Sequence, residues 1–289
     1  MIFLFYFLAV LTARTESTLG KYNGMRGGKA VIFNVEKSLL ATVFALSLAA
    51  FSGGVEFHAA TLGYSAIYGA FLAVSMVAGL RALSLGSMAI TSTVVSFSLV
   101  IPTLFGIIFL DESIGIIGII AFVMLAVSLL LLNYKKSNNP VSARCWFYSI
   151  LTMVANGISS VIQKLHQTDF PEKYSSEFML YGMSTAFILL SLVAIYDRIK
   201  EGGGREHTKK RLTLFSLLGA GAGVCNGASN YLILTLAATE KASVMFPILS
   251  AANAVGSCLV GYIVFKERLT KLQLISLALG VVSVVLLKI

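Results

Sequence analysis

Ten apolar stretches fill most of this 289-residue chain, and each is close to the length that spans a bilayer. A helix of about 20 residues crosses a hydrocarbon core roughly 30 Å thick, and only helices and closed barrels satisfy their backbone hydrogen bonds there. A barrel would need strands of alternating polarity, whereas residues 101–110 and 114–132 are almost continuously apolar. We therefore predict an all-α integral membrane protein. Its ten expected transmembrane helices lie at residues 2–20, 34–53, 64–85, 88–110, 114–133, 146–165, 175–196, 212–238, 243–265 and 269–288.

Composition and charge support a membrane protein and predict its orientation. Hydrophobic residues make up 57% of the chain and charged residues only 12%, against about 25% charged in an average soluble domain. Most of the 22 basic residues fall in the odd-numbered connections, the first of which we assign Lys21, Arg26, Lys29 and Lys37. Cytoplasmic connections carry the excess of Lys and Arg, so we expect these connections inside the cell and both termini outside. The expected location is the plasma membrane, crossed many times.

The first stretch has a second interpretation, as a cleaved signal peptide, because Leu11-Thr12-Ala13 resembles a small-residue cleavage site. It lacks a basic start, and we keep it as a transmembrane helix. The three cysteines show no paired spacing, and the three histidines are expected in loops without partners at ligand spacing. We therefore expect no disulfide framework, no metal site and no cofactor.

The two halves of the chain have the same order of features. Gly86–Tyr134 aligns with Lys241–Ile289, matching Glu112 with Glu267, and each half begins with a span that ends in lysine, Lys21 or Lys164. Five spans are an odd number, so the halves insert with opposite orientation as inverted repeats, the basis of alternating access. We expect two five-helix repeats, at 1–134 and 146–289, joined by a linker at 135–145.

At these residues the chain resembles the drug/metabolite transporter superfamily, specifically proteins with two EamA domains. The resemblance covers essentially the whole length. It is carried by Asp111-Glu112-Ser113, Lys266-Glu267-Arg268, the two span-ending lysines and the stretch SFSLVIPTLFGIIFLDE. Such proteins export or exchange amino acids, metabolites, drugs or nucleotide sugars, so the resemblance implies a secondary transporter. Related small multidrug pumps hold a proton-coupling glutamate where this chain has Ala13 and Asn156, which puts coupling through that position in doubt.

Polar side chains recur at helical spacing inside the expected spans. Amides and hydroxyls have no water to bind in lipid, so these faces turn toward other helices or toward a watered cavity. Bonds between helices that hold the bundle together are the alternative to a cavity. The residues that we expect to line a substrate cavity are Ser96, Asn156, Gln163, Asn226, Asn230, Ser250 and Asn253.

Arg14 and Glu16 are charges well inside an expected span, where a charge costs at least ~2.5 kcal/mol on insertion scales. They are therefore candidates for coupling, and they point to opposite sides of their helix. The alternative is that both side chains reach the cytoplasmic interface. Glu16 is the better candidate to bind a proton or a cation.

Other residues are expected to be structural. Glu112 and Glu267 can each cap the first turn of the helix that follows, and Lys21 and Lys164 can extend to the membrane surface. Gly219, Gly223 and Gly227 form a stripe of small residues suited to close helix contact or, alternatively, to making room for a substrate. Tyr64 and Tyr68 fit an interfacial aromatic belt as well as a cavity wall.

These observations favour a secondary transporter of a small metabolite, amino acid or drug-like solute. A membrane-embedded enzyme and a channel remain as alternatives, although no HExxH or GxSxG motif and no nucleotide-binding GxxxxGK[ST] loop occurs. The expected partners are a small-molecule substrate and the lipid bilayer, with a homodimer left open and no nucleic acid.

Overall fold

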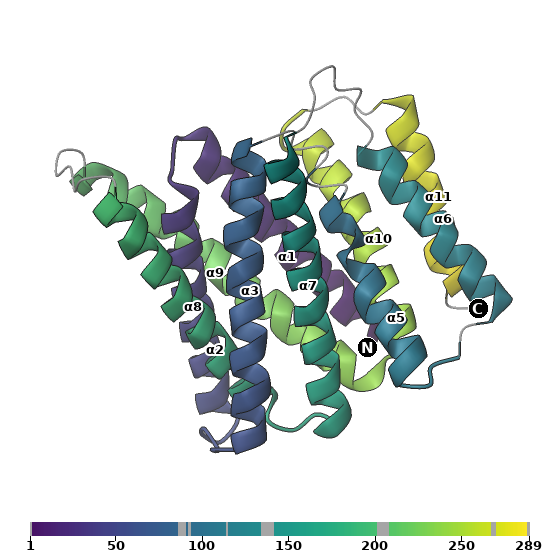
Figure 1. Ribbon diagram of the computed structural model, residues 1–289, viewed down its shortest axis with the longest axis horizontal. Helices are drawn as coiled ribbons and strands as arrows, with labels where there is room; N and C mark the ends of the chain where they lie inside the picture. Colours follow the sequence, from purple (N-terminus) through teal and green to yellow (C-terminus); the bar gives the residue numbers. More distant parts are fainter. Residues whose placement is uncertain are drawn as a thin grey trace.

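The computed structural model describes residues 2–85, 91, 94–113, 115–133, 142–200, 208–266 and 270–287. Within these residues every regular element is a helix (Figure 1). The elements are α1 (Ile2–Met25), α2 (Ala30–Phe51), α3 (Ala59–Leu85), the 3-10 helix η1 (Phe97–Leu99), α5 (Val100–Phe109), α6 (Ile116–Asn133), α7 (Ala143–Asp169), α8 (Ser175–Lys200), α9 (Thr208–Thr239), α10 (Ala242–Ile263) and α11 (Lys271–Leu287). Each of the expected spans overlaps one of the α-helices, so the all-α class is confirmed.

Several helices are long and apolar enough to cross a membrane. In the described residues six meet both criteria, namely α1, α2, α3, α7, α8 and α10. Shorter apolar helical stretches lie at Val94–Phe109, Ile116–Leu132 and Lys271–Leu286. Because a bilayer requires spans of this length and polarity, the chain is a multi-pass membrane protein.

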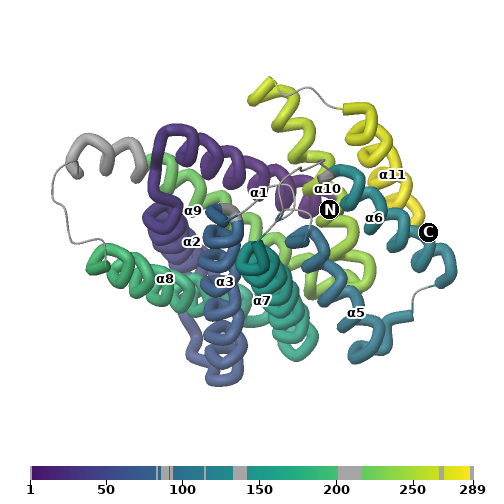
Figure 2. Tube along the Cα trace, turned by 45° about the horizontal axis from the view of Figure 1, so that its top comes forward, coloured from purple at the N-terminus to yellow at the C-terminus, as the bar shows by residue number. Residues whose placement is uncertain are grey.

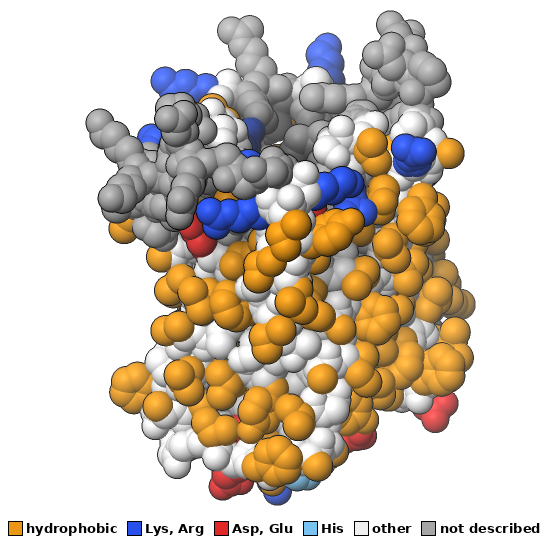
Figure 3. All heavy atoms as spheres, turned by 60° about the vertical axis from the view of Figure 1, so that its left-hand side comes forward, with side chains coloured by type: hydrophobic (Ala, Val, Ile, Leu, Met, Phe, Trp, Pro, Cys, Tyr) orange, Lys and Arg blue, Asp and Glu red, His pale blue; other side chains and the backbone are white. Residues whose placement is uncertain are grey.

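The surface has the charge distribution of a membrane protein. On the face drawn in Figure 3, Lys and Arg side chains gather toward one end, most Asp and Glu side chains lie at the other, and a broad hydrophobic band separates them. Large apolar side chains lie on the surface without protein to cover them. Phe51 is 90% exposed and Ile199 is 75% exposed. This pattern agrees with the basic cytoplasmic end expected from the connections.

The helices pack mostly across the two halves of the chain. α3 contacts α7 and α8, α2 contacts α8 and α9, and α1 contacts α9 and α10. α5 packs against α10 and α7. α6 and α11 lie side by side at one edge of the bundle in both views (Figures 1 and 2), where the Ser128 and Ser276 hydroxyls each donate to the other residue's carbonyl oxygen at 2.6 Å.

The glycine stripe on α9 brings α9 unusually close to α2. A Cβ atom added at Gly223 would lie 2.5 Å from Leu40 Cβ and 2.6 Å from the Lys37 carbonyl oxygen. One added at Gly227 would lie 2.7 Å from the Phe44 ring. The close-contact interpretation of the stripe is therefore confirmed, since no larger residue fits without moving one of the two helices.

We expect Gly223→Ala to destabilise the protein by about 1–3 kcal/mol, because the new methyl group overlaps the α2 backbone. Gly63→Ala is the matched control, since a Cβ added at that glycine of α3 meets no atom within 4 Å. Thermal unfolding of the purified variants in one detergent measures the difference. Equal melting temperatures for the two variants would contradict this account of the α2–α9 contact.

A pair of charged side chains holds the short turn between α9 and α10. The Glu112 carboxylate accepts hydrogen bonds from the backbone N–H groups of Ala242 and Ser243, at 2.8 and 2.7 Å. Lys164 donates to the carbonyl oxygens of Ala237 and Glu240, at 2.9 and 2.6 Å. A carboxylate at a helix N-terminus and an ammonium at a helix C-terminus both complement the helix dipole.

Two expectations are corrected by this turn. Glu112 caps α10, a helix of the second half, whereas the sequence had suggested α6, which follows it directly. Lys164 is buried against α9 and covered by protein, because the free carbonyl groups at the end of α9 lie within its reach. Glu267, the expected counterpart of Glu112, lies outside the described residues.

Candidate functional site

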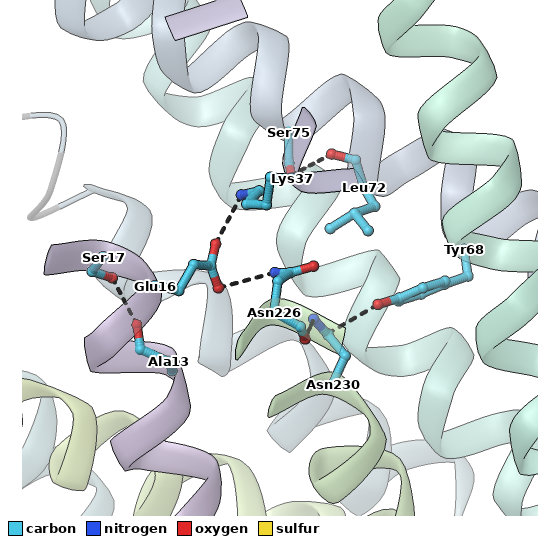
Figure 4. Close-up of polar contacts among 9 residues, drawn as sticks. All are labelled: Ala13, Glu16, Ser17, Lys37, Tyr68, Leu72, Ser75, Asn226 and Asn230. Carbon is cyan, nitrogen blue, oxygen red and sulfur yellow. Dashed lines mark hydrogen bonds and ion pairs between the residues drawn. The ribbon is translucent and has the colours of Figure 1, made fainter. Parts of the chain in front are cut away.

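An ion pair between α1 and α2 lies at the centre of the candidate site (Figure 4). Lys37 Nζ is 2.8 Å from Glu16 Oε1, and the two side chains are 9% and 19% exposed. Buried charges are tolerated when they are paired, because the attraction between them offsets the loss of solvation. Glu16 is thus held by a specific partner between α1 and α2.

Two asparagines on α9 extend this pair toward α3. Asn226 donates its side-chain N–H to Glu16 Oε2 at 3.0 Å, and Asn230 donates to the Asn226 carbonyl oxygen at 2.9 Å. The Tyr68 hydroxyl donates to Asn230 Oδ1 at 3.0 Å, and Gln163 on α7 donates to the Tyr68 oxygen at 3.4 Å. We call the six residues Glu16, Lys37, Tyr68, Gln163, Asn226 and Asn230 the central polar network. It connects α1, α2, α3, α7 and α9.

Local structure explains how the network forms. Asn226 and Asn230 are four residues apart and therefore share one face of α9. Gly223 and Gly227 on the same helix allow α9 to approach α2, which carries Lys37. On the other side, Ser229 donates to the Ala9 carbonyl oxygen at 3.1 Å and ties α9 to α1, which carries Glu16. The close packing of three helices thus brings the charges and the amides together.

The network retains unused hydrogen-bonding capacity. Asn226 Oδ1 is buried and accepts no hydrogen bond from any residue in the described part of the chain. A buried polar atom without a partner is costly, and in native proteins it calls for an explanation such as a ligand. The arrangement offers a carboxylate, an ammonium group and amides, which together can bind a small polar molecule of either charge.

Sequence reasoning identified four of the six network residues, left Tyr68 open between a belt and a cavity wall, and missed Lys37. Lys37 was assigned to a cytoplasmic connection, but it lies in the second turn of α2, because the helix begins at Ala30 and not near residue 34. Tyr68 is 1% exposed in the interior and is not in an interfacial belt. The signal for Lys37 was present, since the apolar run AVIFNV starts well before it.

A second group of expected site residues lies between α1 and α10. Arg14 Nη1 donates to the hydroxyl of Ser257, which in turn donates to the Asn253 carbonyl oxygen at 2.9 Å. Arg14 and Glu16 therefore do point to opposite sides of α1, as expected. Asn156 on α7, Ser96 just before η1 and Ser250 on α10 are half-buried. That all the asparagines line one cavity stays a prediction.

A hollow opens at the acidic end of the bundle, next to the network. Its volume is about 440 Å³, and it is lined by residues 52–54, 56, 172–177 and 231. Tyr231, which follows Asn230 on α9, is one of its lining residues. None of the substrate-cavity residues expected from the sequence lines it.

One histidine differs from the expectation that all three lie in loops, whereas His58 does lie in the loop before α3 and His207 lies outside the described residues. His166 lies within α7 and is fully buried, with its ring nitrogens 3.2 Å from the Thr61 hydroxyl and 3.1 Å from the Gln167 amide. The expectation that it falls in a loop is wrong, because α7 continues past residue 165 to Asp169. Among the described residues, no cluster of three or more His, Cys, Asp or Glu side chains could hold a metal ion.

Comparisons with known proteins agree with this architecture. A crystal structure whose title says only "Crystal structure of protein" has a TM-score of 0.77 at 14% identity, over 100% of this chain and 98% of that one. This likeness concerns the fold alone. No curated protein sequence matches. The model of the EamA-like transporter family matches residues 144–289, half of the chain, and includes α7, α9 and α10. The chain belongs to the EamA-like transporter family and is a membrane transporter of the drug/metabolite type.

Proposed function

We propose that this protein is a secondary transporter that moves a small polar solute by alternating access, with the central polar network as its solute site. The observation that carries the proposal is the buried network itself. Its residues come from five helices of both halves, and it contains an ion pair and an unfilled acceptor in a protein whose exterior is suited to lipid. Ionisable groups inside a membrane are costly and usually mark a transport path.

The helix contacts support the inverted-repeat part of the proposal. Five helices of the first half can be paired in order with five of the second: α1, α2, α3, α5 and α6 with α7, α8, α9, α10 and α11. When each helix is replaced by its counterpart, one observed helix contact becomes another. The α3–α7 contact becomes α9–α1, and α2–α9 becomes α8–α3. In the same way α5–α7 becomes α10–α1, while α2–α8, α5–α10 and α6–α11 become themselves. Two halves packed in this manner can exchange conformations around a shared site.

The shape of the protein suggests how the site is reached. The hollow at the acidic end is lined in part by Tyr231, which follows Asn230 of the network in the chain. Glu56 and Glu177 also line the hollow, so a solute that entered from that end would meet their carboxylates. We propose the acidic end as one of the two openings, and the basic end as the other.

Transport by reconstituted protein tests the proposal. In vesicles loaded with an unlabelled solute, a panel of labelled amino acids, hydroxy acids and amines should include at least one that the parent protein exchanges saturably. Asn226→Ala should lower that exchange at least tenfold, because it removes the hydrogen bond to Glu16 and the free amide oxygen. Thr42→Val is the control, since among the described residues that hydroxyl donates only to the Ser38 carbonyl oxygen of its own helix. Full exchange by Asn226→Ala would refute the assignment of the site.

A further inference from the structure

Arg14 occupies the side of α1 that faces α10, away from the central polar network. Its guanidinium Nη1 donates to the Ser257 hydroxyl. Its aliphatic stem lies over Gly256, where an added Cβ atom would be 2.9 Å from Arg14 Cγ. The absence of a side chain at Gly256 thus makes room for the arginine beside α10.

Arg14 has no ion-pair partner in the described part of the chain. The carboxylate of Glu16, two residues along α1, is paired with Lys37. Its Nε atom is buried and has no hydrogen-bond partner among the residues that the structure describes. Arg14 is half-buried, and a guanidinium that is partly removed from water without an anion is unfavourable in a protein interior and more so in a membrane.

An unfilled acceptor lies about one helical turn from this unfilled donor. Asn253 Oδ1 is buried and also has no partner within the described ranges. Asn253 is four residues before Ser257 on α10, so the two side chains share a face and their Cβ atoms are about 6 Å apart. The Arg14 contact with Ser257 therefore places the guanidinium about one helical turn from the amide.

We infer that Arg14, Asn253 and Ser257 form a binding site for the carboxylate or phosphate group of an anionic solute that also carries a hydroxyl or amine. With Nη1 bonded to Ser257, the Nε and Nη2 edge of the guanidinium can bind two oxygen atoms of such a group side by side. The hydroxyl or amine of the solute can then donate to Asn253 Oδ1. That this solute is the cargo rests on the proposed function, whereas its binding does not.

The depth of Arg14 favours a soluble anion over a lipid headgroup. Arg14 lies near the middle of α1, about 17 Å from either end of the helix at 1.5 Å per residue. Even from the expected end of the span at residue 20, a headgroup phosphate would have to reach six residues inward, about 9 Å along the helix. A solute bound between the halves would meet the guanidinium directly.

Binding can be measured without transport, by following thermal unfolding of the protein in nanodiscs of phosphatidylcholine. Sodium lactate or inorganic phosphate replaces chloride, and the ionic strength is kept constant. One of the two anions should raise the melting temperature of the parent by a few degrees and saturably. Arg14→Gln should lose this rise, and Asn253→Ala should weaken the effect of lactate. Arg81→Gln is the control and should keep the rise, because that arginine is exposed and contacts Tyr148. Without added anion, Arg14→Gln should be at least as stable as the parent, since it removes an unpaired charge.

The inference is overturned if neither anion stabilises the parent, or if the rise is equal in Arg14→Gln. A second set of nanodiscs containing phosphatidylglycerol tests the source of the anion. If stabilisation depends on Arg14 but arises only from that lipid, the anion is a headgroup, and the inference of a solute is wrong. Because no transport is measured, a negative result leaves the central polar network untouched. Normal exchange by Asn226→Ala would reject the network without affecting this site.

Discussion

Lys37→Met should destabilise the protein by about 2–3 kcal/mol. The substitution removes the partner of Glu16 and leaves a carboxylate unpaired between α1, α2 and α9. Breaking a fully buried ion pair costs roughly 3–5 kcal/mol, and we expect less here because Glu16 is 19% exposed and keeps its bond to Asn226. Denaturant unfolding in mixed micelles gives the free energy.

A second substitution separates the ion pair from the loss of lysine packing. Glu16→Gln combined with Lys37→Met should recover most of the lost stability, because no buried charge remains without a partner. Lys200→Met, at the exposed end of α8, should change stability by less than about 0.5 kcal/mol. If the double variant is as unstable as Lys37→Met, the ion pair is not what makes Lys37 important.

Glu112→Ala should destabilise the protein by about 2–4 kcal/mol. The carboxylate accepts two backbone hydrogen bonds at the start of α10, and each bond to a charged group contributes roughly 1.5–3 kcal/mol. Gly106 makes room for it, since a Cβ atom at that glycine would lie 2.6 Å from Glu112 Oε2. Thermal unfolding in detergent measures the loss.

Asp111→Asn is the matched control for Glu112. Asp111 is exposed, and its φ of 52° is one that asparagine tolerates, so the variant should unfold at the temperature of the parent. The unfolding temperature of Glu112→Gln should lie between those of the parent and Glu112→Ala. The carboxylate offers one oxygen atom to each of the two N–H groups, whereas the amide has a single oxygen atom. A Glu112→Ala protein as stable as the control would contradict the capping of α10.

The fold was predictable from the sequence because the bilayer leaves few choices. A span must be helical, of limited length and apolar, so its position can be read from hydrophobicity alone. The helix ends were less predictable. α1 continues to Met25 and α7 to Asp169, beyond the apolar runs, because a helix that leaves the membrane continues until its backbone groups find caps or water.

The site was predictable only in part, for a different reason. Polar residues inside a span stand out, which is why Glu16, Gln163, Asn226 and Asn230 could be identified. Their partners depend on how helices from the two halves meet, and periodicity within one helix carries no information about that. Lys37 and Tyr68 near the expected span ends, and the contact of Glu112 with α10, follow from packing between segments distant in the sequence.

Alternating access to the central polar network is most directly tested by the Asn226→Cys variant. In this variant the native Cys145, Cys225 and Cys258 are replaced by serine, so that the new cysteine is the single thiol. A membrane-impermeant thiol reagent should label this cysteine both in cells and in inverted membrane vesicles, because water reaches the network from each side in turn and a thiol reacts as the hydrated thiolate. A cysteine at Val224, exposed on the apolar exterior, should remain unlabelled from both sides. Labelling of the Asn226 position from one side only, or from neither, would contradict a site that opens alternately to the two sides of the membrane.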